Sequence, residues 1–227
     1  LVGGEKMSKS KLTGIAPEQI IDHFGVDAFR YYFLRAIQFG NDGSFSWEDL
    51  AARYQAELAN GFGNLASRTL AMVTRYFDGV VPAAGELTPS DKAIADVVAA
   101  AAVEADAAIE RLAIHDAVTS IWTIVDALNG YITEQEPWAL AKDPANAGRL
   151  ATVLNTATEG LRALAVLLSP FMPQATQKLW SALNVEPSLG ALTAQPIREA
   201  GKWNQVPIGT TVGALEALFP RIESSAE

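Results

Sequence analysis

The sequence predicts a mainly α-helical fold: a helical bundle, preceded by a small mixed α/β region and followed by an irregular C-terminal segment. Three observations lead to this prediction. Apolar residues recur at helical spacing through most of the chain, helix-capping patterns precede these runs, and the periodicity ends at Asn184, after which prolines recur. We therefore expect three parts, at residues 1–46, 47–183 and 184–227.

The N-terminal part combines a loop with short elements. Residues 1–13 are rich in Gly, Ser and Lys and indicate an exposed loop. Pro17 is expected to open a short helix that Gly25 ends, and Asp27 to cap the next helix. A turn at residues 40–43 and a short strand at residues 44–46 complete the expected mixed α/β region.

The central part carries the strongest helix signals. Ser46-Trp47-Glu48-Asp49 fits a capping box, so a helix should begin at Trp47 and run to Gly79, with a weak point at Gly61 and Gly63. Thr88-Pro89-Ser90-Asp91 should open the most regular amphipathic helix. Further helices are expected from Asp116, from Asp143-Pro144 and from Pro173.

In the C-terminal part only residues 212–218 look helical. Trp203, Leu218 and Phe219 should nevertheless pack this segment against the body. We also assign Trp47, Trp122 and Trp180 to the core, together with Trp203.

Composition narrows the functional classes. The chain has 227 residues, 49% of them hydrophobic and 19% charged, enough for a sizeable buried core. Without cysteine, disulfides and thiolate metal sites are excluded, which suits a reducing cytoplasm. Two distant histidines make a metal centre unexpected, and no apolar run is long enough to span a membrane. The net charge of −9 argues mildly against nucleic-acid binding but does not exclude a local basic patch.

The N-terminal loop contains a candidate phosphate-binding motif, Lys6-Met7-Ser8-Lys9-Ser10. Two ammonium groups three residues apart can neutralise phosphate oxygens, and the hydroxyl groups add donors. From charge alone, a solvated basic loop is the better interpretation. The chain starts at Leu1, and we interpret it as part of a longer polypeptide.

Two further patterns suggest contact with unpaired bases. Asn64 and Arg68 stand four residues apart and share a helix face, where an amide and a guanidinium can bind a base edge. Trp138 follows a proline that ends a helix, a place where an indole can offer a stacking surface. Taken alone, an ordinary surface pair and a core tryptophan remain open interpretations.

The order of motifs resembles methionyl-tRNA synthetases, from their KMSKS loop through their anticodon-binding domain. The resemblance spans essentially the whole chain. It rests on these segments: Val2-Gly3-Gly4-Glu5 before KMSKS, Lys11-Leu12 and residues 22–32 after it, Asn64-Leu65-Ala66-Ser67-Arg68, Glu136-Pro137-Trp138 with Lys142, Ser169-Pro170-Phe171-Met172-Pro173 and Leu218-Phe219-Pro220-Arg221-Ile222.

This resemblance implies part of a class I, ATP-dependent methionine–tRNA ligase, which activates methionine as an adenylate and transfers it to tRNA(Met). Lys6 and Lys9 would be catalytic. Met7, Ser8 and Ser10 would join them in binding ATP, with Mg²⁺ implied by the family. Asn64 and Arg68 would read the first anticodon base beside Trp138.

The family's methionine pocket and HIGH-type motif would lie upstream, so this segment alone should be inactive. Two alternatives stay open: a leucyl, isoleucyl, valyl or cysteinyl relative, and a non-catalytic tRNA-binding or helical adaptor module.

Overall fold

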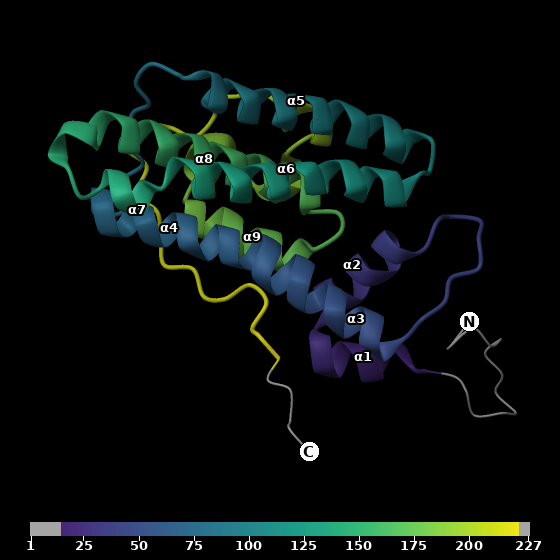
Figure 1. Cartoon of the computed structure of the whole chain (residues 1–227). Helices are drawn as coiled ribbons and strands as arrows, with labels where there is room; N and C mark the ends of the chain where they lie inside the picture. The colour runs from purple at the N-terminus through teal and green to yellow at the C-terminus, as the bar shows by residue number, and fades with distance from the viewer. Residues whose placement is uncertain (1–14, 223–227) are drawn as a thin grey trace, which may run out of the picture.

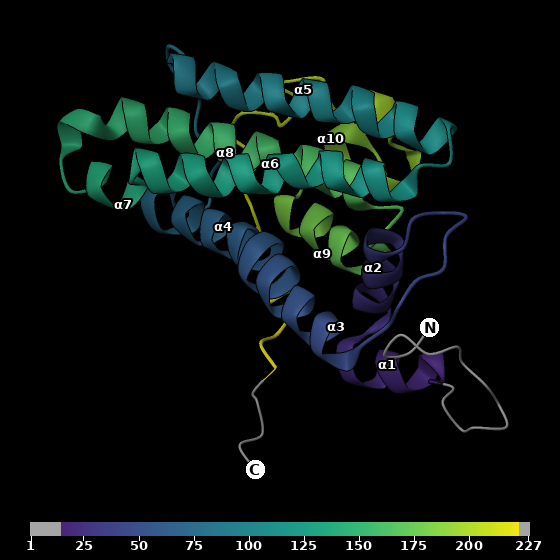
Figure 2. The ribbon, with the colours of Figure 1, turned by 45° about the vertical axis from the view of Figure 1, so that its right-hand side comes forward.

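The computed structural model describes residues 15–222, which fold into a bundle of long helices with three shorter ones at one end (Figures 1 and 2). Helices α4, α5, α6, α8 and α9 form the bundle, and α1, α2 and α3 gather at the N-terminal end of the long helical stretch that leads into α4. The α-helices are α1 Pro17–Phe24, α2 Val26–Ala36, α3 Trp47–Arg53, α4 Asn64–Phe77, α5 Pro89–Glu110, α6 Ile114–Gln135, α7 Pro137–Leu140, α8 Ala147–Leu168, α9 Pro173–Leu183 and α10 Glu186–Leu189. A π-helix, η1 (Tyr54–Gly63), joins α3 to α4, and 3-10 turns occupy η2 Pro144–Asn146, η3 Leu192–Ala194 and η4 Ile197–Glu199.

Helix α8 lies at the centre of the core. Every residue from Thr156 to Leu168 is buried, as expected for a helix that is covered on all sides. Helices α4, α5, α6 and α9 pack around it. Gly160 leaves room for the Leu128 side chain of α6, because a Cβ at position 160 would lie 2.7 Å from Leu128 Cδ1. The mainly helical bundle predicted from periodicity is therefore confirmed.

The predicted helix starts are confirmed where the capping partner is local. Ser46 Oγ accepts a hydrogen bond from Asp49 N at 3.0 Å, and α3 begins at Trp47. Thr88 and Asp91 form a complete capping box, and Pro89 is the first residue of α5. Each cap satisfies backbone N–H groups that the first helical turn leaves without partners.

The predicted cap at Asp27 is wrong. Gly25 occupies the capping position of α2, and Asp27 lies inside that helix. The buried Asp27 carboxylate instead accepts a hydrogen bond from Ala175 N, at the start of α9, over 2.6 Å. It thus satisfies a helix end 148 residues away in sequence, a partner that local sequence cannot reveal.

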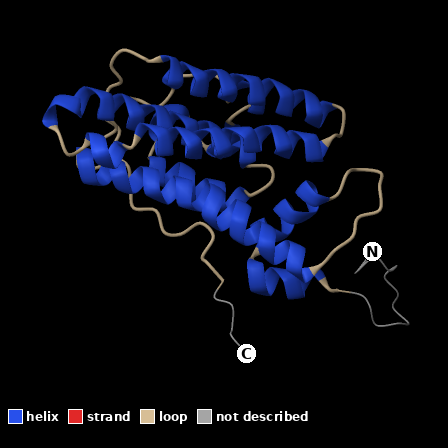
Figure 3. Ribbon diagram, in the orientation of Figure 1, coloured by secondary structure: helices blue, strands red, loops and turns tan. Residues whose placement is uncertain are grey.

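The N-terminal region is less mixed than predicted. Residues 15–222 contain no strand (Figure 3), and the expected strand at residues 44–46 is reduced to a single bridge residue, Phe45. Phe45 is buried in a small apolar cluster with Ile20, Tyr32 and Leu50. Trp47 was wrongly assigned to the core. It starts α3 at the rim of this cluster and is 37% exposed.

The predicted weak point at Gly61 and Gly63 is a π-helix. A Cβ on Gly61 would lie 3.2 Å from Ala56 O, and one on Gly63 would lie 3.0 Å from Leu58 O. Each close oxygen belongs to the residue five positions earlier, the partner that π-helical hydrogen bonding selects. Glycine therefore suits both positions, and the long helix continues through them into α4.

The C-terminal segment packs on the bundle, as predicted, but without the helix expected at residues 212–218. Its backbone bonds to other segments instead: Val212 N donates to Gly79 O at 2.8 Å, and Gly213 N donates to Ala182 O at 2.7 Å. These bonds hold the chain extended. Leu218 and Phe219 are buried against the core, and Trp203 is half-buried.

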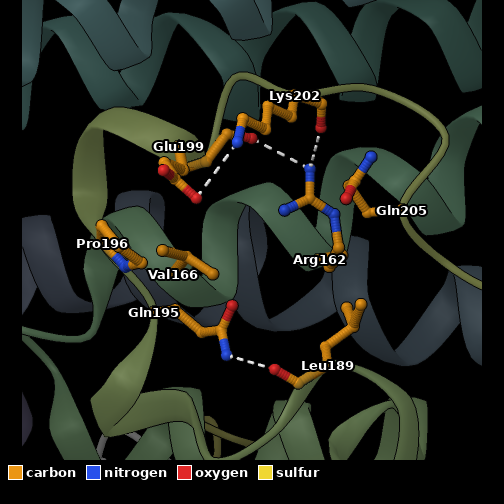
Figure 4. Close-up of a pocket in the computed structure, with 9 residues that line it drawn as sticks. Arg162, Val166, Leu189, Gln195, Pro196, Glu199, Lys202 and Gln205 are labelled. Carbon is orange, nitrogen blue, oxygen red and sulfur yellow. Dashed lines mark hydrogen bonds and ion pairs between the residues drawn. The ribbon is translucent and has the colours of Figure 1, made fainter.

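A buried ion pair on α8, Arg162 with Glu159, holds the preceding stretch of this segment, and Figure 4 shows the bonds from Arg162 to the backbone of that stretch. Arg162 Nε donates to Glu159 Oε1 at 2.7 Å, while Arg162 Nη2 donates to the carbonyls of Ala200 and Lys202 at 2.9 and 2.7 Å. Glu159 Oε2 accepts from Val206 N at 2.8 Å. One side-chain pair therefore satisfies three backbone groups.

Candidate nucleic-acid interface

The motif Lys6-Met7-Ser8-Lys9-Ser10 lies outside the described residues. Its assignment to ATP therefore stays a prediction from the sequence. The other predicted site residues all fall within residues 15–222.

Asn64 and Arg68 lie on the surface side of α4. Asn64 is the first residue after the π-helix and is exposed, and Arg68 follows one turn later, half-buried. Leu65, Ala66 and Thr69 turn the opposite side of the helix into the core. The predicted shared face is thus present.

The junction of α6 and α7 presents Trp138. Glu136 ends α6 in the left-handed conformation, with φ 45°, and turns the chain sharply. Pro137 is the buried first residue of α7, and Trp138 follows with 39% of its surface exposed. The sequence-based stacking interpretation required such exposure, which a core tryptophan would lack.

Arg68 and Trp138 are brought together across 70 positions of sequence. Arg68 Cζ lies over the indole, 5.8 Å from the ring centroid, within the range of a cation–π contact. Burial lowers the pKa of Arg68, but an arginine remains charged at neutral pH.

The Arg68 guanidinium also has hydrogen-bond donors without acceptors. Its Nε and Nη2 atoms are buried and have no hydrogen-bond partner among the described residues. A buried donor without an acceptor costs about 1–3 kcal/mol, so a water molecule or a ligand is expected to supply the acceptors.

A polar cluster at the C-terminal end of α6 was missed by the sequence analysis. Arg149 of α8 donates to both carboxylate oxygens of Asp91 at 2.6 and 2.9 Å, and to Gln135 Oε1 at 2.6 Å. Tyr131 of α6 also donates to Asp91. The cluster joins α5, α6 and α8 at the last turn of α6. The capping box identified Asp91 as a cap, but no local signal pointed to Arg149.

The environment of Asp91 favours its charged form. Burial alone would disfavour ionisation, but the hydrogen bonds from Arg149, Tyr131 and Thr88 outweigh it and lower the pKa of Asp91 to about 2. The Asp91 side chain at the centre of this cluster is therefore a carboxylate at neutral pH.

The described part of the chain contains neither a metal-binding group of side chains nor a membrane-spanning helix. No group of three or more His, Asp or Glu side chains within residues 15–222 is arranged to hold a metal ion. In the same range, no helix is long and apolar enough to cross a membrane.

Two family models match the sequence in succession. Residues 1–70 match the model of class I tRNA synthetases (M), and residues 81–227 match the anticodon binding domain of methionyl tRNA ligase. The candidate interface draws on both regions, with Asn64 and Arg68 from the first and Trp138 from the second. The models describe methionine enzymes and do not favour the leucyl, isoleucyl, valyl, cysteinyl or adaptor alternatives.

Individual relatives agree with the models. The methionine–tRNA ligase of Streptomyces coelicolor is 56% identical over 226 residues, covering 98% of this chain and 42% of that protein. The ligase of Caldanaerobacter subterraneus subsp. tengcongensis is 39% identical over 227 residues, covering all of this chain and 35% of that protein. The chain thus spans less than half the length of these relatives.

A solved structure shows the same fold. The methionyl-tRNA synthetase of Mycobacterium tuberculosis in complex with methionyl-adenylate superposes with a TM-score of 0.85 at 33% identity, covering 96% of this chain and 42% of that one. The anticodon-domain model alone matches well over half of the chain. The chain therefore belongs to the methionyl-tRNA ligase family and carries that family's anticodon binding domain.

Proposed function

We propose that this chain is part of a methionine–tRNA ligase that activates methionine with ATP and transfers it to tRNA(Met) in the cytoplasm. Family membership and the methionyl-adenylate bound to the Mycobacterium tuberculosis relative support the proposal. Residues 1–46 would supply the KMSKS loop and the stem-contact region, residues 47–183 would read the anticodon, and residues 184–227 would form a tail that packs back on the body. The methionine pocket would lie outside the chain.

The ATP-binding role falls to the N-terminal loop. Lys6 and Lys9 would neutralise phosphate oxygens of ATP, with Mg²⁺ sharing that charge, and Met7, Ser8 and Ser10 would complete the loop. Ammonium groups stabilise a transition state when their contacts strengthen as negative charge develops on the departing pyrophosphate.

The anticodon-reading role falls to Asn64, Arg68 and Trp138. The observation that carries it is the Arg68 guanidinium, which lies over an exposed indole with two buried N–H donors unsatisfied. An unpaired base that stacks on Trp138 meets those donors and the Asn64 amide at its edge.

The donor pattern suits cytosine, the first base of the CAU anticodon that pairs with the methionine codon. The Watson–Crick edge of cytosine offers two acceptors and one amino donor. Arg68 can donate to the acceptors, and the Asn64 side-chain oxygen can accept from the amino group.

Binding of an RNA stem-loop with a CAU loop tests this assignment, with fluorescence anisotropy as the measurement. Trp138→Ala should remove one stacking contact of about 1–3 kcal/mol, which weakens binding about 5- to 150-fold. Asn64→Ala and Arg68→Ala should reduce the preference for CAU over UAU.

Trp47→Ala is the matched control, because Trp47 is 37% exposed against 39% for Trp138 but lies on α3 rather than on α7. The control should leave RNA affinity unchanged. A folded Trp138→Ala variant that binds the CAU loop as tightly as the parent would refute the anticodon-reading role.

A further inference from the structure

Helix α4 differs in charge from the rest of the chain. The chain carries 26 acidic residues against 17 basic ones, yet α4 contains two arginines and no Asp or Glu. These arginines, Arg68 and Arg75, stand seven residues apart and therefore lie on the same face of the helix, about 10 Å apart along its axis.

Within residues 15–222, neither arginine of α4 forms an ion pair with an acidic side chain. Neither of them donates a hydrogen bond to another residue in that range. Four arginines elsewhere are paired: Arg53 with Asp49 and Glu57, Arg111 with Glu104 and Asp116, Arg149 with Asp91, and Arg162 with Glu159. Arg75 is exposed, and its recorded contact is with the neighbouring Tyr76 ring, 5.6 Å from the centroid. An acidic protein that leaves two aligned cations free offers them to an anionic ligand.

A groove runs beside Arg75. Its walls are residues of α4 and of the extended C-terminal segment, and it encloses about 390 Å³. The bond from Val212 N to Gly79 O holds the second wall against the end of α4. The lining residues are Ser67, Leu70, Ala71, Thr74 and Arg75 from α4, and Val212, Gly213, Ala214 and Leu215 opposite.

We propose that Arg75 and this groove form a second RNA subsite, which holds a nucleotide flanking the anticodon by its phosphate. The inference rests on the proposed function, since Asn64, Arg68 and Arg75 share one helix face and an RNA strand bound at the first two passes the third. The groove's apolar walls suit a base or ribose, and the free guanidinium at its edge suits a phosphate. Such a contact strengthens binding without reading sequence.

The salt dependence of binding separates this role from base reading. Arg75→Gln should weaken binding of the CAU stem-loop and of a UAU stem-loop by the same factor. It should also reduce the slope of log affinity against log salt by about 0.7, the value for one phosphate contact to a single strand. The affinity ratio of parent to variant should therefore shrink about 2.6-fold between about 50 and 200 mM salt.

Arg198→Gln is the matched control. Arg198 is exposed and lies on η4, which packs against α5, so its loss changes the net charge equally but away from α4. The control should keep the parent slope. An Arg75→Gln variant with the slope and affinity of Arg198→Gln would overturn the proposal, even where Trp138→Ala still weakens binding.

Arg75 also lies in the last turn of α4, where a cation stabilises the helix dipole. A lower melting temperature for Arg75→Gln with unchanged RNA binding would assign it that role alone, and would equally overturn the subsite. If neither Trp138→Ala nor Arg75→Gln changed the affinity for RNA, the proposed function itself would be refuted.

Discussion

Replacing Arg162 with methionine should release the stretch of the C-terminal segment around residues 200–206. The side chains of Arg162 and Glu159 are only 4% and 3% exposed. The substitution leaves the Ala200 and Lys202 carbonyls without a donor and Glu159 with the single N–H of Val206. Two charge-assisted bonds contribute about 3 kcal/mol, and an unpaired buried carboxylate brings the expected loss to about 3–5 kcal/mol.

Urea unfolding followed by circular dichroism measures this loss, and hydrogen exchange of the Val206 amide locates it. Glu159→Gln is the comparison variant, because it keeps an acceptor for Val206 N and nearly the same volume while removing the charge. It should cost less than Arg162→Met. A loss below about 1 kcal/mol for Arg162→Met, with unchanged protection of the Val206 amide, would refute the reasoning.

Two further predictions concern the bundle. The pKa of Asp91 is lowered from 3.8 to about 2 in the folded state, so the stabilisation by its carboxylate is present above pH 3.8 and is lost as the pH falls toward 2. Asp91→Asn should therefore flatten the fall in melting temperature across that pH window. An unchanged fall would contradict the assignment. Gly160→Ala should destabilise the protein by about 1–3 kcal/mol in urea unfolding, because the new Cβ would lie 2.7 Å from Leu128 Cδ1. Combining it with Leu128→Ala should cost less unfolding free energy than the sum of the two single losses. Strict additivity would exclude this clash as the cause.

The sequence predicted best those features whose partners are close in the chain. Ser46 with Asp49, and Thr88 with Asp91, lie three residues apart, so both helix starts were visible. The prediction that Asp27 caps its own helix was wrong because its partner, Ala175, belongs to another helix. The helix predicted at residues 212–218 is absent for the same reason, because backbone groups of this stretch bond to segments that only the folded chain brings near.

In the candidate interface, too, the sequence predicted the local features but not those that depend on tertiary contacts. Four-residue spacing placed Asn64 and Arg68 on one face, and Pro137 indicated the exposure of Trp138. The contact of Arg68 with the indole, the polar cluster at Asp91 and Arg149, and the groove beside Arg75 all depend on tertiary packing. The roles of Asn64, Arg68 and Trp138 remain proposals that the binding experiments address.

The π-helix has a consequence for how tolerant this protein can be of changes in length. A π-helix has more residues per turn than an α-helix, so each of its residues advances the side-chain direction by somewhat less than the α-helical value of about 100°. Deleting one residue between Tyr54 and Gly63 would therefore swing Asn64 and Arg68 about a quarter-turn around the axis, away from Trp138, while Leu50 kept its place in the N-terminal cluster. The ten residues of η1 thus act as a rotational spacer, and a change in their number redirects the arginine face of α4 even where every side chain on it is retained.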